Sequence, residues 1–481
     1  MPKIKITERD LTGTIQPSQI SNTVFVPIQK RSDDTKKRDQ AFMHVKSVDM
    51  LNEYLTGSDA VYLSDPRANS VQDLNGDLGY KLCKHLLNIG LDVLVTVVDS
   101  VDNIDWTSLT DKGLYDIRFI TLGAMTDATG AGMSKAKTCA ETRGDCTALF
   151  NLPVGWSYAV ADQSSSTAGG TGTTENTGDG SGENEGNVPN ENSLMELADE
   201  DTPTSVVEKI QTFFLFAGAS EYCACFAPNF ISTNSDLVKK TLDEDNSPKN
   251  PNYVQGSTEE GKSNKYLRNV YEVEEAEIPA AFGYLFAYAA AIKNNPEWYA
   301  IAGFQRGFIP ELSDVSYELS TCEMLTLQAR EASTIADAYK LDTEKDNVGT
   351  AINPIAYIRP AGYIIYGNRT YRYNDAAKKT TAQSFLNVRN MISAIKKKLW
   401  DASRKFTFEP NNELLWVRFK SFVTPYLDQL QAGNGIIGYK FERLATTAKA
   451  RLKCRLVIIP VEAVEDFEIE VTLADDLTVV E

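Results

Sequence analysis

The sequence has very little histidine and no long apolar run. Only two histidines, His44 and His85, occur among 481 residues, and no nucleophile elbow of the G-x-S-x-G type accompanies them. A Ser-His-Asp triad would have to use one of these two residues, so we expect no enzyme activity of this kind. No run of about eighteen apolar residues is present, which predicts no membrane-spanning segment and no direct membrane insertion. The first residues, MPKIKITERD, lack the apolar core of a secretory signal.

Basic residues are fewer than acidic ones, 48 against 66, which gives a formal net charge of −18. Nucleic-acid binding requires a surface rich in Lys and Arg, so we expect no nucleic-acid partner. A large charge of one sign is typical of a soluble protein whose copies stay apart until they are brought together.

The seven cysteines are odd in number and irregularly spaced. Cys223 and Cys225 are too close in sequence for the usual zinc pair, and no second pair lies nearby. In a strand their thiols would face the same side, as ordinary core residues do. We therefore expect most of the seven to be small buried residues in a reducing compartment, with no metal and no cofactor; the other cysteines are Cys83, Cys139, Cys146, Cys322 and Cys454.

One segment matches the phosphate-binding pattern G-x-x-x-x-G-K-[ST] in every letter, from Gly256 to Ser263. The chemistry also needs a buried strand before the glycines and a helix after them. The preceding residues, DEDNSPKNPNYVQ, indicate a loop, and Glu259 and Glu260 would place carboxylates against phosphates. We interpret the match as coincidental.

A chain of this length predicts two or three domains. Its first half alternates apolar, β-branched runs with amphipathic stretches, which is typical of an α/β fold with a parallel sheet covered on both faces. We expect strands at 91–98, 114–122 and 148–153, and helices at 77–89 and 134–142.

The middle of the chain contains two polar segments, 163–208 and 233–264, which we expect to be surface loops because they have too few apolar residues to form a core. After them, Ile278–Ile292 predicts an apolar helix, and 297–307 a buried strand with a glycine turn. The polar residues EKDNVGT favour a domain boundary near residue 350.

The last part of the chain predicts strands around turns at Pro360 and Gly367, then an amphipathic helix at 381–400. A second helix follows, capped by Asn411 or Asn412. Its apolar face consists of Leu415, Phe419, Phe422 and Tyr426, with Val423, Leu427 and Leu430 beside them. Pro425 predicts a kink or a break, and Gly433 and Gly435 predict the helix end.

Two strands of opposite charge are expected at the ends of the chain. Phe467, Ile469, Val471 and Leu473 alternate with Glu468, Glu470 and Thr472, and Lys3-Ile4-Lys5-Ile6-Thr7 alternates in the same way. Lysines facing glutamates across a strand pair contribute about 0.2–1 kcal/mol per pair. The residues leave open whether the strands pair within one subunit or between subunits.

An ordered series of segments resembles the tail sheath proteins of contractile bacteriophages and related injection systems. ITERDLTG resembles the opening arm, and AETRGDCTALFNLPVG a helix with Arg-x-Asp followed by a strand. Asn353-Pro354 and Gly367-Asn368-Arg369-Thr370 match an Asn-Pro-Ile stretch and a Gly-Asn-Arg-Thr turn. SFLNVRNMISAIKKKLW, FEPNNELLW and IIPVEAVEDFEIEVTL follow in the order of the family's closing domain.

The resemblance implies an N-terminal arm (1–24), an outer α/β region (25–350) and an inner, tube-facing α+β domain (351–466), followed by a C-terminal arm (467–481). Within the outer region it implies a middle domain similar to subtilisin but without its triad. It also implies a helical homo-oligomer of stacked rings in the tail of a virion, assembled in the host cytoplasm, or in the bacterial cytoplasm for an injection system. The implied partners are a tail tube, a baseplate and a tail terminator.

For particular residues, the resemblance implies that the arms join neighbouring subunits. These arms contain Lys3, Ile4, Lys5, Ile6, Phe467, Glu468, Ile469, Glu470, Val471 and Leu473. It implies that the helix after Asn411 faces the tube through Glu413, Arg418 and Lys420, with Lys396, Lys397 and Lys398 as a second candidate patch. The implied function is structural: the polymer contracts and drives the tube through the envelope of the target cell. The alternatives are an α/β enzyme and another shell or filament protein.

Overall fold

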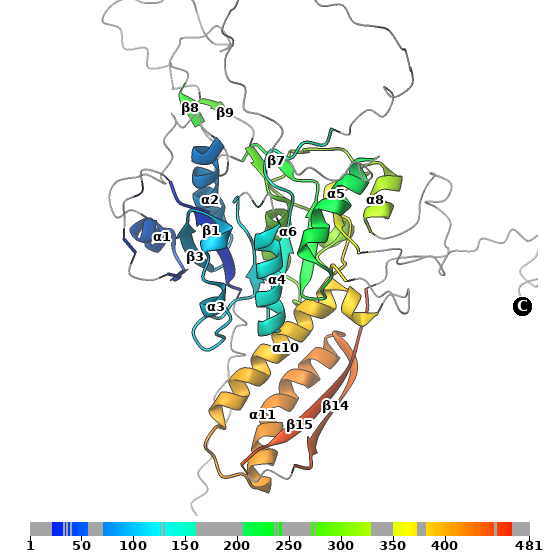
Figure 1. The fold of residues 1–481 in the computed structure, drawn as a ribbon. Coiled ribbons are helices and arrows are strands. Elements are labelled where there is room, and N and C mark those ends of the chain that lie inside the picture. Colours follow the sequence, from blue (N-terminus) through cyan, green and yellow to red (C-terminus); the bar gives the residue numbers. More distant parts are fainter. Residues whose placement is uncertain are drawn as a thin grey trace, which may run out of the picture.

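The computed structural model describes residues 22–31, 34, 37–38, 41–55, 71–125, 127, 130–159, 205–234, 237, 240–242, 271–273, 276–328, 350–372, 381–446 and 450–463. They form an α/β body and a smaller C-terminal module (Figure 1). Within the described ranges, no helix combines the length and the apolarity that crossing a bilayer requires.

The body is organised on an eight-stranded sheet of order β13-β12-β6-β5-β4-β1-β3-β2. Its six inner strands are parallel, and the two edge strands, β2 and β13, are antiparallel to their neighbours. The strands are β1 (Val24–Gln29), β2 (Met43–Val45), β3 (Val93–Val98), β4 (Phe119–Ile120), β5 (Thr147–Phe150), β6 (Cys223–Ala227), β12 (Asn353–Ile358) and β13 (Gly362–Ile365).

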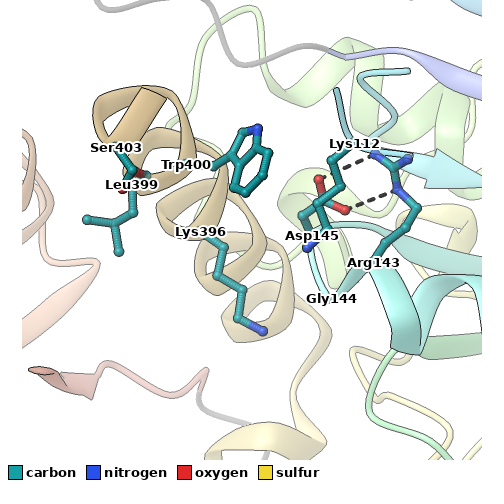
Figure 2. Close-up of a pocket in the computed structure, with 8 residues that line it drawn as sticks. All are labelled: Lys112, Arg143, Gly144, Asp145, Lys396, Leu399, Trp400 and Ser403. Atoms are coloured by element: carbon teal, nitrogen blue, oxygen red, sulfur yellow. Dashed lines mark hydrogen bonds and ion pairs between the residues drawn. The ribbon is translucent and has the colours of Figure 1, made fainter. Parts of the chain in front are cut away.

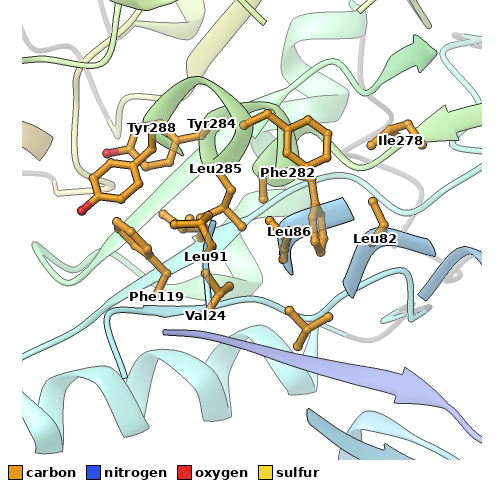
Figure 3. Packing of buried hydrophobic residues seen from close by; sticks show 14 of the residues in the cluster. Val24, Leu82, Leu86, Leu91, Phe119, Ile278, Phe282, Tyr284, Leu285 and Tyr288 are labelled. Carbon is orange, nitrogen blue, oxygen red and sulfur yellow. The ribbon is translucent and has the colours of Figure 1, made fainter. Parts of the chain in front are cut away.

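Helices cover both faces of this sheet because side chains alternate along each strand. In β1, Val24 and Val26 enter one core and Phe25 enters the other. The first core includes residues of α1 (Val48–Leu55), α2 (Val71–Asn88) and α6 (Ala280–Ala291); the second includes residues of α3 (Trp106–Leu109), α4 (Ala131–Arg143), α5 (Val206–Phe214) and α8 (Thr321–Leu327). Figure 3 shows α6 of the first core lying over Leu82, Leu86 and Phe119.

Smaller elements complete the body. Two short sheets contain β10 (Ala276–Ile278), β7 (Phe230–Ser232) and β11 (Asp314–Val315), and β8 (Lys240–Leu242) with β9 (Tyr271–Val273). Short helices are η1 (Val101–Asn103), η4 (Leu215–Ala217), α7 (Gly303–Arg306) and η5 (Ala382–Ser384).

The C-terminal module contains α10 (Leu386–Lys405), α11 (Glu413–Ala432), β14 (Ile436–Leu444) and β15 (Lys453–Pro460). It has a separate core in which α10 and α11 pack with the β14–β15 hairpin. The boundary expected near residue 350 is wrong, since β12 and β13 belong to the large sheet through the parallel pairing of β12 with β6. Polar, turn-forming residues there interrupt the chain without ending the domain.

The α/β prediction is confirmed, but several ranges differ. The strand expected at 114–122 is reduced to β4, because residues before Arg118 form turns such as Tyr115 N–H to Asp111 O. The strand expected at 297–307 is absent: Gly303 has a φ of +70°, outside the strand region, and begins α7.

The two expected loops, 163–208 and 233–264, lie largely outside the described residues. Where their ends are described, they contain regular structure. Ser205 caps α5 by accepting a hydrogen bond from the Glu208 N–H at 3.2 Å, and Lys240–Leu242 forms β8. Polar composition alone therefore did not mark where these segments end.

Candidate functional site: the C-terminal module and its seam with the body

The two histidines occupy structural positions. His85 is buried, its Nε2 lies 3.0 Å from Glu311 Oε1, and its ring meets Phe286 edge-on. His44 Nε2 lies 3.2 Å from the hydroxyl of Thr23. In the described part of the chain, no hydrogen bond joins either ring to a serine or a thiol, and no three His, Cys, Asp or Glu residues gather into a metal site.

Cys223 and Cys225 are fully buried on one side of β6 and belong to the same core, as predicted. Burial raises the pKa of both thiols because the thiolate would lose its hydration. Neither is activated for nucleophilic chemistry. The phosphate-pattern segment 256–263 lies outside the described residues.

The start of α11 is fixed by one side chain. Asn412 Oδ1 accepts a hydrogen bond from the Leu415 N–H at 2.9 Å, so Asn412 is the cap. The helix continues past Pro425 to Ala432, and the expected break there does not occur. Packing holds the helix on both sides of the proline. Before it, Trp416 contacts Phe441 with 5.1 Å between ring centroids, and after it Leu427 and Leu430 are buried in the core of the module.

The inward face of α11 is the one predicted from its periodicity. Phe419 packs edge-on against Phe406 at 5.7 Å, and Val423 and Leu427 are buried beside it. Phe422 and Tyr426 pack against the same core. The helix is therefore anchored to α10 and to the hairpin along its whole length.

The outward face of α11 is partly apolar. Leu414 and Val417 are each 54% exposed, and exposed Arg418 and Ser421 complete the same helical face. We call these four residues the outer α11 face. These two neighbouring aliphatic side chains make the outer α11 face a candidate surface for contact with another protein.

The hairpin leaves edges open. Among the described residues, β14 and β15 pair only with each other. Their outer face is also apolar, since Ile437 is 64% and Ile459 54% exposed. Unpaired edges and an exposed apolar face are the features that accept an added strand.

The seam between module and body is polar. Lys397 is buried, and its Nζ donates to the Asp116 carboxylate and to the Ile117 carbonyl, the latter at 2.7 Å. Burial lowers the pKa of Lys397. Trp298 Nε1 donates to the Gly433 carbonyl at 2.9 Å. These bonds fix α10 and the end of α11 to the body.

Comparison with known proteins identifies the fold. No protein-family model matches the chain. The chain is similar over nearly its whole length to the sheath complex of the extracellular contractile injection system PVC in its contracted state. The TM-score is 0.54 at 13% sequence identity, with 99% of this chain and 98% of that chain covered. The chain has the fold of a contractile sheath protein.

Two further similarities agree. The contracted helical sheath of the anti-feeding prophage (AFP) covers 99% of this chain, with a TM-score of 0.52 and 13% identity. The tail sheath protein of Vibrio phage KVP40 is 24% identical over 176 residues, 37% of this chain. The chain matches 22% of the length of that relative. The resemblance to contractile sheath proteins predicted from the sequence is confirmed at the level of the fold.

The sheath fold places the predicted tube-facing residues unequally. Arg418 and Lys420 are exposed on α11. Glu413 is paired with Arg443 on β14 at 2.8 Å. Lys396 Nζ donates to the Tyr222 hydroxyl at 3.0 Å, and Lys398 lies over the Tyr426 ring.

The prediction that Lys397 belongs to an exposed, tube-facing patch is wrong, because this side chain is buried in the seam. Lys397 lies on the buried face of α10, and the carboxylate of Asp116 accepts a hydrogen bond from its ammonium group. Leu414 and Val417 were not among the candidate surface residues predicted from the sequence. Their spacing of three residues predicts that they share one face of a helix, but their exposure depends on how α11 packs in the module. The arm residues 3–6 and 467–473 lie outside the described residues.

Proposed function

We propose that this chain is the structural subunit of a contractile sheath, which polymerises around a tail tube and contracts to drive the tube through a target envelope. The observation that carries the proposal is the similarity over whole chains, 99% and 98%, to the PVC sheath. A fold matched from end to end constrains the assembly more than a match of one domain does. No catalytic step is assigned to the chain.

In this proposal the α/β body is the outer region, subtilisin-like in its parallel sheet and lacking the triad. The inner domain is the C-terminal module, and its boundary falls between Arg372 and Thr381, because β12 and β13 belong to the body. The expected arm 1–24 is too long, because Thr23 and Val24 already pair within the large sheet. We propose residues 1–21 and 467–481 as the arms that join neighbouring subunits, with the open edges of β14 and β15 as their acceptors. The sheath ends contact a baseplate and a terminator.

Contraction follows as a change of lattice. Subunits first assemble around the tube in an extended, metastable lattice. On a trigger from the baseplate they move to a shorter, wider lattice while the arms keep them linked. The new interfaces between subunits are more stable than the tube interface that they replace, so no nucleotide is consumed. The particle is a virion tail or an injection machine.

The decisive experiment is electron microscopy of the purified chain, expressed alone and together with its tube protein. We expect hollow helical cylinders without any cofactor, long around the tube and shorter and wider after contraction. Closed icosahedral shells, flat layers or persistent monomers under all conditions would exclude a sheath.

The outer α11 face is proposed to contact the tube. Changing Leu414→Asp and Val417→Asp together should lower the fraction of sheath bound to tubes about tenfold or more, equivalent to at least about 1.4 kcal/mol. The reason is that two aliphatic side chains no longer pack on the tube and carboxylates take their place. Arg418→Glu should weaken binding further at low salt. The measurement is co-sedimentation with preformed tubes.

The matched control is Leu215→Asp, which changes an aliphatic residue on the body that is 66% exposed, somewhat more than Leu414 and Val417. It should bind tubes as the parent does. An equal loss of binding in the control, or unchanged binding in the Leu414/Val417 variant, would show that the outer α11 face does not contact the tube. The proposal that the chain polymerises into a sheath would still stand.

A further inference from the structure

A pocket of about 330 Å³ lies in the seam, between the end of α4 and one side of α10 (Figure 2). Its lining includes Lys112, Arg143, Asp145, Lys396, Leu399 and Trp400. We call it the seam pocket. None of its residues belongs to the outer α11 face, so a ligand of the pocket does not compete for the surface proposed to contact the tube.

The pocket is basic. Asp145 is neutralised by buried Arg143, whose Nε lies 3.1 Å from Asp145 Oδ1. Arg143 also donates to the carbonyls of Leu109 and Tyr115. Among the described residues, no carboxylate pairs with the ammonium groups of Lys112 and Lys396, and Lys396 donates to a neutral hydroxyl. A ligand of this pocket should carry carboxylates.

The pocket is also apolar on its α10 side. Leu399 lines it, and Trp400 is 46% exposed. Figure 2 shows the Trp400 ring lying between α10 and the Lys112–Asp145 side of the pocket. A half-exposed tryptophan at the edge of a basic pocket is typical of a binding hot spot, so the ligand should also carry aliphatic groups.

The chain contains one segment of this chemistry that the sheath function does not use. Residues 160–204 contain ten acidic residues and neither Lys nor Arg. Their large apolar residues are concentrated in Ser193-Leu-Met-Glu-Leu-Ala-Asp-Glu-Asp201. Ser193 and Glu196 have the spacing of a capping box, and Leu194 and Leu197 have helical spacing. The segment 193–201 lies outside the described residues.

We propose that the acidic segment 193–201 of this chain docks in the seam pocket. Its aliphatic residues contact Trp400 and Leu399, and its carboxylates pair with Lys112 and Lys396. Charge complementarity and the match of one aliphatic cluster to one apolar wall favour this occupant over the C-terminal segment, whose strict alternation suits a strand.

The test uses a fluorescein-labelled peptide of residues 190–204 and the full chain carrying Leu194→Ser and Leu197→Ser, so that its own segment does not compete. We expect saturable binding by fluorescence anisotropy. Trp400→Ala and Lys112→Glu should each weaken it at least about tenfold, the effect of about 1.4 kcal/mol. A peptide with both leucines changed to serine should not bind.

The matched controls are Phe408→Ala, another exposed aromatic, and Lys293→Glu, another exposed lysine. Both should bind the peptide as the parent does, and all variants should melt at the parent temperature. Absence of saturable binding, or equal affinity in Trp400→Ala and Lys112→Glu, would overturn the proposal. The assay needs no tube and no polymer, so its failure leaves the sheath proposal standing.

Discussion

Chains that lack residues 1–10 or residues 467–481 should fail to form long sheaths. In the proposed assembly, each deletion takes away one of the two arms that join neighbouring subunits. A cross-strand pair contributes about 0.2–1 kcal/mol. Because a deletion would remove several pairs at each junction, and the polymer repeats the junction many times, the total loss of stability should be large. Sheath length in electron micrographs is the measurement, and we expect short rings or monomers.

The control is a deletion of similar length that has no strand pattern, residues 165–179 of the polar segment 163–208. It should leave sheath length unchanged. Charge reversal gives a second readout: Lys3→Glu with Lys5→Glu should shorten sheaths, and adding Glu468→Lys with Glu470→Lys should restore them. Contractile sheaths of full length from the truncated chains would refute the arm assignment.

Replacing Arg143 by methionine should destabilise the body by about 3–5 kcal/mol, the usual cost of removing one partner of a buried ion pair. Arg143 is buried and donates to Asp145, Leu109 O and Tyr115 O. Without it, a buried carboxylate and two carbonyls lose their donor. Urea unfolding followed by circular dichroism measures the change.

Lys135→Met is the matched control, because Lys135 lies on the same helix and pairs with Asp102 at 2.6 Å, but both side chains are about half exposed. Its cost should stay within about 1 kcal/mol. If both variants unfold at the same urea concentration, the Arg143 cluster does not stabilise the body, and the Arg-x-Asp pattern has another meaning.

Elements with a clear period were predicted well. The run at 91–98 became the buried strand β3, and the amphipathic pattern after residue 411 became α11 with its expected inward face. The hydrophobic period of an element indicates which of its sides is buried. A prediction from it therefore holds even when the segment that packs against that side is unknown. The predicted ends were less accurate, because caps such as Ser205 depend on single side chains.

Other predictions failed where a partner distant in sequence decides the outcome. Lys397 was predicted on the surface because lysine is usually solvated. In the structure its ammonium group instead donates to the carboxylate of Asp116, 281 residues away in the sequence. The boundary near residue 350 failed for a similar reason, since β12 joins β6 across the body.

By itself, the sequence determined the α/β class, the succession of strands and helices, and the order of segments by which the chain resembles contractile sheath proteins. These follow from local periodicity and from the order of residues along the chain. Only the tertiary structure decided which strands share the large sheet, which lysines are buried in the seam, and that Leu414, Val417 and Trp400 stay exposed. Burial at these positions is set by packing between distant segments, which the local pattern around them does not encode.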